Sequence, residues 1–248
     1  MNNINNKKIL LIICGGISAY KSLEVIRLLK KRGAIVKTIL TKSAKEFVTP
    51  LSVSSLSQEK VYDDLFNAEN EAEMDHISLS RWSDLILVAP ATANTISKLS
   101  VGSSDDLAST VMLASNKDIF LTPAMNVRMW EHPSTKENLN KLKKYGYKII
   151  GPEIGDMACG EFGEGKMTEP NEIIKKIETY FFNFLRFSLV EGCSHILTFI
   201  AGAKKISLSE ASITVEAKSS EEPLLNFEIV FAVAGATNIK LDHLEREI

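Results

Sequence analysis

Lys8-Ile-Leu-Leu-Ile-Ile-Cys-Gly-Gly16 is the stretch that decides the fold of this 248-residue chain. A continuous apolar run that ends in two glycines is typical of a strand buried on both faces and followed by a tight turn. Ser18–Arg32 then places apolar side chains at helical spacing and stops at Gly33. Ala34–Leu40 is a second apolar strand. This order predicts a βαβ unit, in which a right-handed crossover joins two parallel strands.

The same alternation continues to about residue 182. It predicts further strands at Asp84–Ala89, Asp118–Leu121 and Tyr147–Ile150, and further helices at Thr92–Leu99, Asp106–Ala114, Thr135–Tyr145 and Glu169–Phe181. Such a pattern favours an α/β fold with a doubly wound parallel sheet, Rossmann-like or flavodoxin-like, and helices on both faces. Glu153–Thr168 is rich in glycine and lacks periodicity, so we predict a long functional loop there.

The character of the sequence changes near residue 183. Short strand-like stretches follow, separated by serine-rich and acidic breaks, at Leu185–Leu189, His195–Ile200, Ala211–Glu216 and Phe227–Ala234. No recognisable site emerges among them. We therefore expect one domain over residues 1–182 and a short C-terminal appendage over residues 183–248.

Composition and charge exclude several classes of function. With 45% hydrophobic residues, 24% charged residues and a net charge of −2, the chain is typical of a soluble globular protein. It lacks the basic field that nucleic acid or anionic lipid would require. Ile9–Ile13 is too short to span a bilayer, and no signal-peptide cleavage pattern follows it. Cys14, Cys159 and Cys193 have neither zinc-site nor disulfide-framework spacing. We expect a cytoplasmic protein that binds a small molecule, without a metal, nucleic acid or membrane.

Small and hydroxyl-bearing residues follow the first two predicted strands. Gly15-Gly16-Ile-Ser18 lets the backbone approach a ligand closely and directs helix N-terminal amides at an anion. Thr41-Lys-Ser43 follows the second strand, at the sheet edge where open α/β folds bind ligands. The pair favours a phosphate-bearing cofactor. Because the spacing is not the dinucleotide fingerprint, NAD is disfavoured. A plain tight turn would explain the two glycines equally well.

Two later strands also end in small or neutral polar residues. Pro90-Ala-Thr-Ala-Asn94 offers a surface for a flat ring, with groups that can hydrogen-bond its edge. Pro123-Ala-Met-Asn-Val-Arg-Met-Trp130 places an amide, Asn126, between apolar side chains, and an amide can donate and accept hydrogen bonds without titrating. Taken singly, the first stretch is equally consistent with a helix cap and the second with core packing.

Three motifs together resemble the homo-oligomeric flavin-containing cysteine decarboxylases, and among these the phosphopantothenoylcysteine decarboxylases. They are Pro123–Trp130, Met74-Asp-His-Ile77 and Gly155-Asp-Met-Ala-Cys-Gly-Glu-Phe-Gly-Glu-Gly-Lys-Met167, and the resemblance covers Lys8–Phe181. It implies FMN as the cofactor and 4′-phosphopantothenoylcysteine as the small-molecule substrate, decarboxylated to 4′-phosphopantetheine in coenzyme A biosynthesis. The implied route oxidises the thiol to a thioaldehyde, releases carbon dioxide and re-reduces the enethiol.

The resemblance also assigns site residues. His76 would serve the oxidation and decarboxylation, Asn126 would hold the substrate carboxylate, and Cys159 would protonate the product. The implied FMN contacts are Gly15, Gly16, Ser18, Thr41, Ser43, Ala91, Thr92 and Asn94. The implied substrate contacts are Met125, Asn126, Ala158, Gly160, Lys166 and Met167.

Oligomers, trimeric or dodecameric, with active sites at subunit interfaces are a further implication. In many members the domain is fused to a ligase that makes the substrate. Residues 183–248 are too few for a typical nucleotide-binding domain, so we interpret them as a remnant of a ligase domain or a divergent extension. We expect no ligase activity and a separate ligase as the source of substrate. Two alternatives stay open: a peptidyl-cysteine decarboxylase, and a non-enzymatic flavin-binding regulatory subunit.

Overall fold

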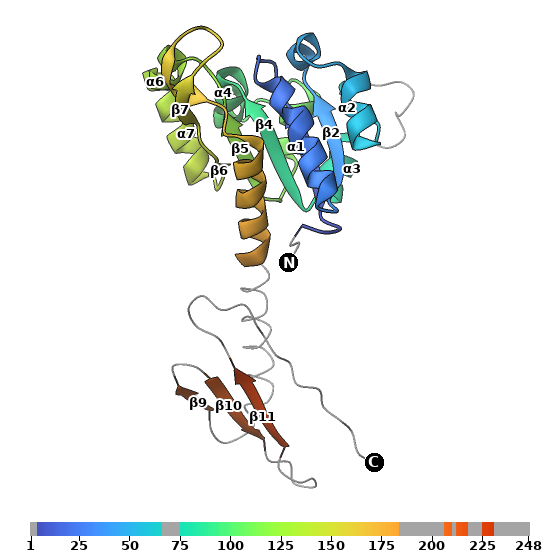
Figure 1. Ribbon diagram of the computed structural model, residues 1–248, viewed down its shortest axis with the longest axis vertical. Helices are drawn as coiled ribbons and strands as arrows, with labels where there is room; N and C mark the ends of the chain where they lie inside the picture. Colours follow the sequence, from blue (N-terminus) through green and yellow to red (C-terminus); the bar gives the residue numbers. More distant parts are fainter. Residues whose placement is uncertain (1–3, 66–74, 184–205, 210–211, 218–224, 231–248) are drawn as a thin grey trace. The chain divides into compact units, whose positions relative to one another are not determined.

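A single parallel sheet organises the first part of the chain in the computed structural model (Figure 1). The structure describes residues 4–65, 75–183, 206–209, 212–217 and 225–230. Chain contacts divide the protein into two compact units, Met1–Phe182 and Asn183–Ile248. The described strands of the first unit pair in the order β3-β2-β1-β4-β5-β6. Their bounds are β1 (Lys8–Ile13), β2 (Ile35–Leu40), β3 (Val61–Tyr62), β4 (Leu85–Ala91), β5 (Ile119–Pro123) and β6 (Lys148–Ile149).

The two central strands, β1 and β4, are buried almost throughout. Every residue of β4 is buried, as is every residue of β1 after Lys8. Ile9 and Leu11 pack into the hydrophobic core on one face of the sheet, and Leu10 and Ile12 pack into the core on the other. A strand with helices above and below must be apolar at successive positions. This requirement explains why continuous apolar runs predicted the strands correctly.

Helices cover both faces of the sheet, which confirms the predicted doubly wound α/β fold (Figure 1). The core on one face includes side chains of α1 (Ala19–Lys31), α2 (Pro50–Ser57) and a helix described over residues 170–183. The core on the other face includes side chains of α3 (Asp75–Trp82), α4 (Ala93–Val101), α5 (Leu107–Leu113), α6 (Val127–Glu131) and α7 (Pro133–Lys144). A short 3-10 helix, η1 (Lys42–Glu46), follows β2.

Some of these elements were not predicted. The sequence of α2 is serine-rich and carries only a weak apolar stripe, although Thr49 caps it and Pro50 begins it. Strand β3 has two residues, too few for a readable pattern. Glu153–Thr168 was predicted to be a loop, which is wrong in part, because β7 (Glu153–Asp156) and β8 (Phe162–Lys166) pair as an antiparallel hairpin. Its glycines hide the alternation that normally marks a strand.

The second unit contains three described strands. They are β9 (Ile206–Ser209), β10 (Ser212–Ala217) and β11 (Leu225–Val230), paired antiparallel in the order β11-β10-β9. Strand β10 confirms the prediction at Ala211–Glu216, and β11 overlaps the one at Phe227–Ala234. The predicted strands Leu185–Leu189 and His195–Ile200 lie outside the described residues. Among the helices that are described, none is long and apolar enough to cross a membrane.

Shortening a side chain at the centre of the sheet should cost substantial stability. Leu87 is fully buried in β4 and lies between Leu11 and Phe120 on the neighbouring strands. We expect Leu87→Ala to lower the free energy of unfolding by about 2 to 5 kcal/mol, because the cavity cannot fully collapse. Urea unfolding followed by tryptophan fluorescence is the measurement, since the protein's two tryptophans, Trp82 and Trp130, both lie in the first unit.

Leu51→Ala is the matched control, because Leu51 is 75% exposed. It should change the free energy of unfolding by less than about 0.5 kcal/mol. Equal effects of the two substitutions would contradict the assignment of β4 to the centre of the core.

Candidate active site

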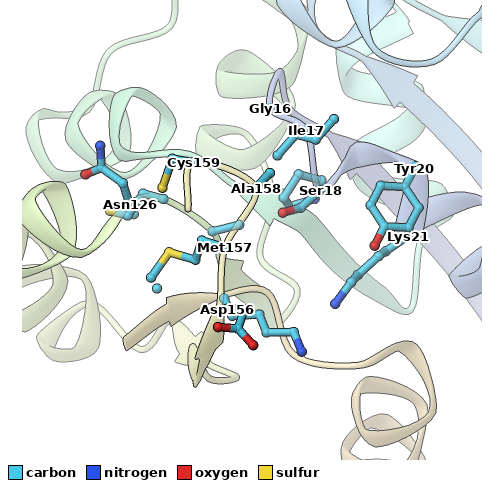
Figure 2. Close-up of a pocket in the computed structure, with 15 residues that line it drawn as sticks. Gly16, Ile17, Ser18, Tyr20, Lys21, Asn126, Asp156, Met157, Ala158 and Cys159 are labelled. Carbon is cyan, nitrogen blue, oxygen red and sulfur yellow. The ribbon is translucent and has the colours of Figure 1, made fainter. Parts of the chain in front are cut away.

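A pocket of about 260 Å³ lies at the carboxyl ends of β1, β4 and β5 (Figure 2). Four separate segments line it: the turn before α1 with the start of α1, Pro90 near the end of β4, the residues after β5, and the β7–β8 hairpin. From β1 the strands are added outward on one side as β2 and β3, and then on the other side as β4, β5 and β6, so the strand order reverses between β1 and β4. Ligands of open α/β sheets bind at such a switch point, outside the carboxyl ends of the strands.

The pocket brings together predicted site residues that are far apart in sequence. They are Gly16 and Ser18 from the start of α1, Met125 and Asn126 from the segment after β5, and Ala158, Cys159 and Lys166 from the hairpin. Figure 2 shows Cys159 and Asn126 toward one side of the pocket, and Tyr20 and Lys21 toward the other. The view therefore separates a thiol and an amide at one end from an ammonium group at the other.

Four other predicted cofactor residues, Gly15, Ser43, Ala91 and Thr92, lie in or close to the Gly15-Gly16 turn that borders this pocket. A Cβ atom on Gly15 would fall 2.3 Å from the Cβ atom of Ser43, so only glycine allows η1 to approach so closely. A Cβ atom on Gly16 would lie 4.0 Å from the Cγ2 atom of Thr92, at ordinary contact distance. The Gly15-Gly16 turn is thus flanked by both hydroxyl-bearing segments. Ala91 is buried directly before Thr92.

Three predicted residues lie away from the pocket lining. Thr41 lines a second hollow of about 600 Å³, together with Asp63–Leu65 and Asp105–Ala108. Asn94 is exposed on α4. Gly160 lies at the tip of the hairpin, with a backbone φ of +82°.

His76 is the second residue of α3, and its side chain is half-buried. It is not among the described residues that line either hollow. Helix α3 leads into β4 and packs beside α5 on the sheet. A helix that feeds a parallel strand runs antiparallel to it, so the start of α3 faces the sheet edge that holds the pocket. His76 therefore lies at the sheet edge that holds the pocket, but it does not line the pocket.

Asn126 serves as the N-cap of α6. Its Oδ1 accepts a hydrogen bond from the backbone N–H of Met129 over 2.8 Å. This bond fixes the amide orientation, because the carbonyl oxygen must face the helix. The Nδ2 group is then the part of the side chain left to donate to a ligand.

Cys159 is exposed on the hairpin. Its Sγ donates to the Oε2 atom of Glu161 over 3.7 Å. Sequence reasoning missed Glu161, although a carboxylate two residues from a predicted proton donor was a usable signal. The pair gives the thiol a neighbouring group that can accept and return a proton.

Lys21 was also missed, and it lines the opposite end of the pocket. Its Nζ donates to the carbonyl oxygen of Met167 over 3.1 Å and to Oε1 of Glu169 over 2.8 Å. Lys166 Nζ lies 3.4 Å from the same Oε1 atom. The bond from Lys21 lowers the pKa of Glu169. The predicted substrate contact Met167 has its side chain fully buried in the core, and its carbonyl oxygen anchors Lys21.

The hydroxyl group at the start of α1 is not used to cap the helix, although the backbone N–H groups of Ala19, Tyr20 and Lys21 already donate to preceding carbonyl oxygens. Ser18 is the N-cap, yet its hydroxyl makes no capping bond, and no acidic residue lies in the first turn. Thr41, the N-cap of η1, likewise makes no side-chain cap. Thr92 and Asn126, by contrast, both cap their helices. With the open backbone at Gly15-Gly16, these two hydroxyls at helix N-termini fit a phosphate-bearing group.

The hairpin lies directly on the segment that carries Asn126. The backbone N–H of Met125 donates to the carbonyl oxygen of Gly165 over 3.1 Å. A Cβ atom on Gly165 would fall 2.3 Å from the carbonyl oxygen of Met125, and one on Gly163 would fall 2.8 Å from Cγ2 of Val127. Glycines at alternate positions of β8 therefore allow the hairpin to close one wall of the pocket.

Comparison with known proteins supplies independent information. A family model described as Flavoprotein matches residues 1–182. The coenzyme A biosynthesis bifunctional protein CoaBC of Haemophilus influenzae is 45% identical over 178 residues, which are 72% of this chain and 44% of that protein. The chain thus spans less than half the length of that curated relative.

Solved structures resemble the first unit over nearly their whole length. A PPC decarboxylase mutant complexed with pantothenoylaminoethenethiol is 29% identical with a TM-score of 0.64, and the match covers 71% of this chain and 98% of that one. The FMN binding protein AtHal3 is 30% identical with a TM-score of 0.62, over 71% of this chain and 97% of that one.

Adding a methyl group to β8 should displace the hairpin from the segment that follows β5. Gly165→Ala would place its Cβ atom against the Met125 carbonyl oxygen, a rigid backbone atom. Because Lys166 follows directly, we expect faster trypsin cleavage after Lys166 in the folded protein. Timed digestion analysed by mass spectrometry measures the rate.

Gly102→Ala is the control for backbone strain alone. Gly102 also has a positive φ, +70°, but its Cβ atom would meet nothing within 4 Å. Cleavage after Lys166 should be unchanged in this variant. If Gly165→Ala were cleaved no faster than Gly102→Ala, the contact between β8 and Met125 would not hold the hairpin.

Proposed function

This chain belongs to the Flavoprotein family, and from that premise we propose that it decarboxylates 4′-phosphopantothenoylcysteine to 4′-phosphopantetheine with bound FMN, in coenzyme A biosynthesis. One observation carries the proposal: a single pocket at the switch point joins Ser18, Asn126 and Cys159. The relative named for coenzyme A biosynthesis and the solved PPC decarboxylase support the substrate. We further propose that residues 1–182 form the decarboxylase domain and residues 183–248 an appendage.

FMN is the cofactor, in agreement with the family and with the FMN-binding structural neighbour. We propose that Gly15, Gly16, Ser18, Thr41 and Ser43 hold its phosphate and ribityl chain, and that Ala91, Thr92 and Asn94 contact its ring. When bound, FMN would accept two electrons as the substrate thiol is oxidised to a thioaldehyde, and the reduced flavin would return the two electrons to the enethiol. The thiocarbonyl group is the electron sink that an ordinary amino acid carboxylate lacks.

Asn126 orients the carboxylate that is lost. Its Oδ1 is committed to the cap of α6, so its Nδ2 donates to the substrate carboxylate. An amide remains neutral at every physiological pH, so it can hold the carboxylate without a strong ion pair that would oppose carbon dioxide release. The rigid cap keeps this donor in place.

Cys159 delivers a proton to the enethiolate. The thiol lies at the pocket, and Glu161 accepts its hydrogen bond, which aims the S–H group. Lys166 and the backbone of Ala158 and Gly160 contact the rest of the substrate, while Met125 packs against it. The hairpin, which carries all of these residues except Met125, also limits the entry of water.

His76 accepts a proton during the oxidation of the thiol. Its place at the start of α3, outside its own chain's pocket, suits a residue that completes a site on a neighbouring subunit. We propose a homo-oligomer, trimeric or dodecameric, with sites of this kind. Mixing a variant inactivated at His76 with a variant inactivated at Cys159 would then restore activity, because a mixed interface can combine an intact His76 with an intact Cys159.

Two other functions would use the same fold. A peptidyl-cysteine decarboxylase would release carbon dioxide from a peptide with a C-terminal cysteine, and a regulatory subunit would bind FMN without decarboxylating either substrate. Assaying both substrates separates the three. Assaying this chain with phosphopantothenate, cysteine and CTP tests whether it can also make the substrate.

Removal of the hairpin thiol should stall the reaction before its last step. We expect Cys159→Ser to accumulate an oxidised, decarboxylated product, because serine cannot deliver the proton. Mass spectrometry after incubation with FMN and 4′-phosphopantothenoylcysteine measures both products. Cys193→Ser controls for loss of a thiol outside the matched family region. Normal phosphopantetheine formation by Cys159→Ser would exclude this role.

An acidic side chain at position 126 should abolish the reaction and leave the fold intact. Asn126→Asp keeps an N-cap oxygen for α6 but sets a carboxylate against that of the substrate. We expect kcat/KM to fall by about 100-fold or more, with FMN still bound. Steady-state carbon dioxide release and the flavin absorbance measure the two properties. Full activity of the variant would refute the proposed contact.

A further inference from the structure

Cys14 lies directly behind the Gly15-Gly16 turn and has no part in the mechanism above. It follows the last residue of β1, and 1% of its surface is exposed. The hydroxyl of Thr95, in the first turn of α4, donates to its Sγ over 3.2 Å. The thiol therefore joins the carboxyl end of β1 to the start of α4.

The connection continues back to the turn. Thr95 Oγ1 lies 3.1 Å from Thr92 Oγ1, and Thr92 Oγ1 accepts the backbone N–H of Thr95 over 3.3 Å. The Cγ2 atom of Thr92 lies 4.0 Å from the place where a Cβ atom on Gly16 would be. Cys14, Thr95 and Thr92 thus form a chain of interactions from the end of β1 to the side of the Gly15-Gly16 turn.

The Cys14 thiol remains neutral in this position. Burial raises the pKa of Cys14 to about 11, so it stays protonated at physiological pH. A buried, protonated thiol is a poor nucleophile. Its contribution is a fixed hydrogen-bond partner for Thr95.

We infer that Cys14, through Thr95 and Thr92, is a positioning residue that fixes the distance between the Gly15-Gly16 turn and α4 for FMN binding. The inference rests on the proposed function for the identity of the cofactor. The turn carries the proposed phosphate contacts, and Thr92 and Asn94 carry the proposed ring contacts. A ligand that contacts both elements loses less freedom on binding when their separation is already set. Preorganisation of this kind increases affinity because less order is lost on binding.

Titration of the apo protein with FMN tests the inference. Thr95→Val removes the hydroxyl at nearly constant volume, and Thr95→Ser keeps it. We expect Thr95→Val to raise the Kd for FMN by about threefold to tenfold, the effect of one lost hydrogen bond, and Thr95→Ser to stay near the wild-type value. Cys14→Ala should match Thr95→Val. Flavin fluorescence quenching gives the Kd, and visible circular dichroism reports a shifted ring environment.

Thr38→Val is the matched control. Thr38 is fully buried in β2, and its hydroxyl has no hydrogen-bond partner among the described residues. This variant should bind FMN as the wild type does. Melting of each apo protein separates positioning from folding: a lower Tm for Thr95→Val with an unchanged Kd and flavin spectrum would overturn the inference.

The outcomes also separate this inference from the proposed function. If the wild type binds FMN and decarboxylates its substrate while Thr95→Val titrates like Thr38→Val, only the inference fails. If the wild type takes up no FMN, both fail. If FMN binds and responds to Thr95→Val as expected but no decarboxylation occurs, the inference holds and the proposed reaction fails.

Discussion

Burial of β1 and β4 on both faces is the constraint on which the rest of the structure depends. A strand enclosed by helices above and below can satisfy its backbone only through neighbouring parallel strands, and parallel strands require helical crossovers. Because all six strands of this sheet are parallel, every connection from a strand to the next helix emerges at the same edge. The segments that line the pocket therefore meet at this edge, and direct hydrogen bonds such as those of Met125 with Gly165 and of Thr95 with Cys14 then fix their positions. Function at this edge is a consequence of how the core is built.

Close backbone approach then turns neighbouring loops into a pocket. Gly15 lets η1 lie against the turn after β1, and Gly165 lets the hairpin lie on the segment after β5. A side chain at either position would push a wall of the pocket outward by the size of a methyl group. The polar groups in these walls are held by caps and buried hydrogen bonds, as at Asn126 and Lys21. Such a site is preorganised, which suits the proposed reaction, because that reaction depends on orienting one carboxylate and one thiol.

The sequence predicted the strands well because a strand buried on both faces needs apolar residues at successive positions, as in Lys8–Ile13. It predicted α2 and β3 poorly, since serine-rich or two-residue elements owe their conformation to tertiary contacts. The hairpin was missed because its glycines allow close approach to Met125 and Val127, which are remote in sequence. Lys21 was missed for the same reason: its partners lie 146 and 148 residues away. The motifs located Asn126 and Cys159, but only the fold reveals that one amide oxygen is already committed to a helix cap.

The two described cysteines show how one chain uses the same side chain for opposite purposes. Cys14 is enclosed by the core, where desolvation penalises the thiolate and leaves a neutral hydrogen-bond partner. Cys159 is exposed on a hairpin that contributes to the pocket, where its S–H meets Glu161 and can reach a ligand. Chemical reactivity thus follows from position in the fold more than from residue type. The positioning role proposed for Cys14 requires a thiol that does not react. The proton delivery proposed for Cys159 requires a thiol that the core does not enclose.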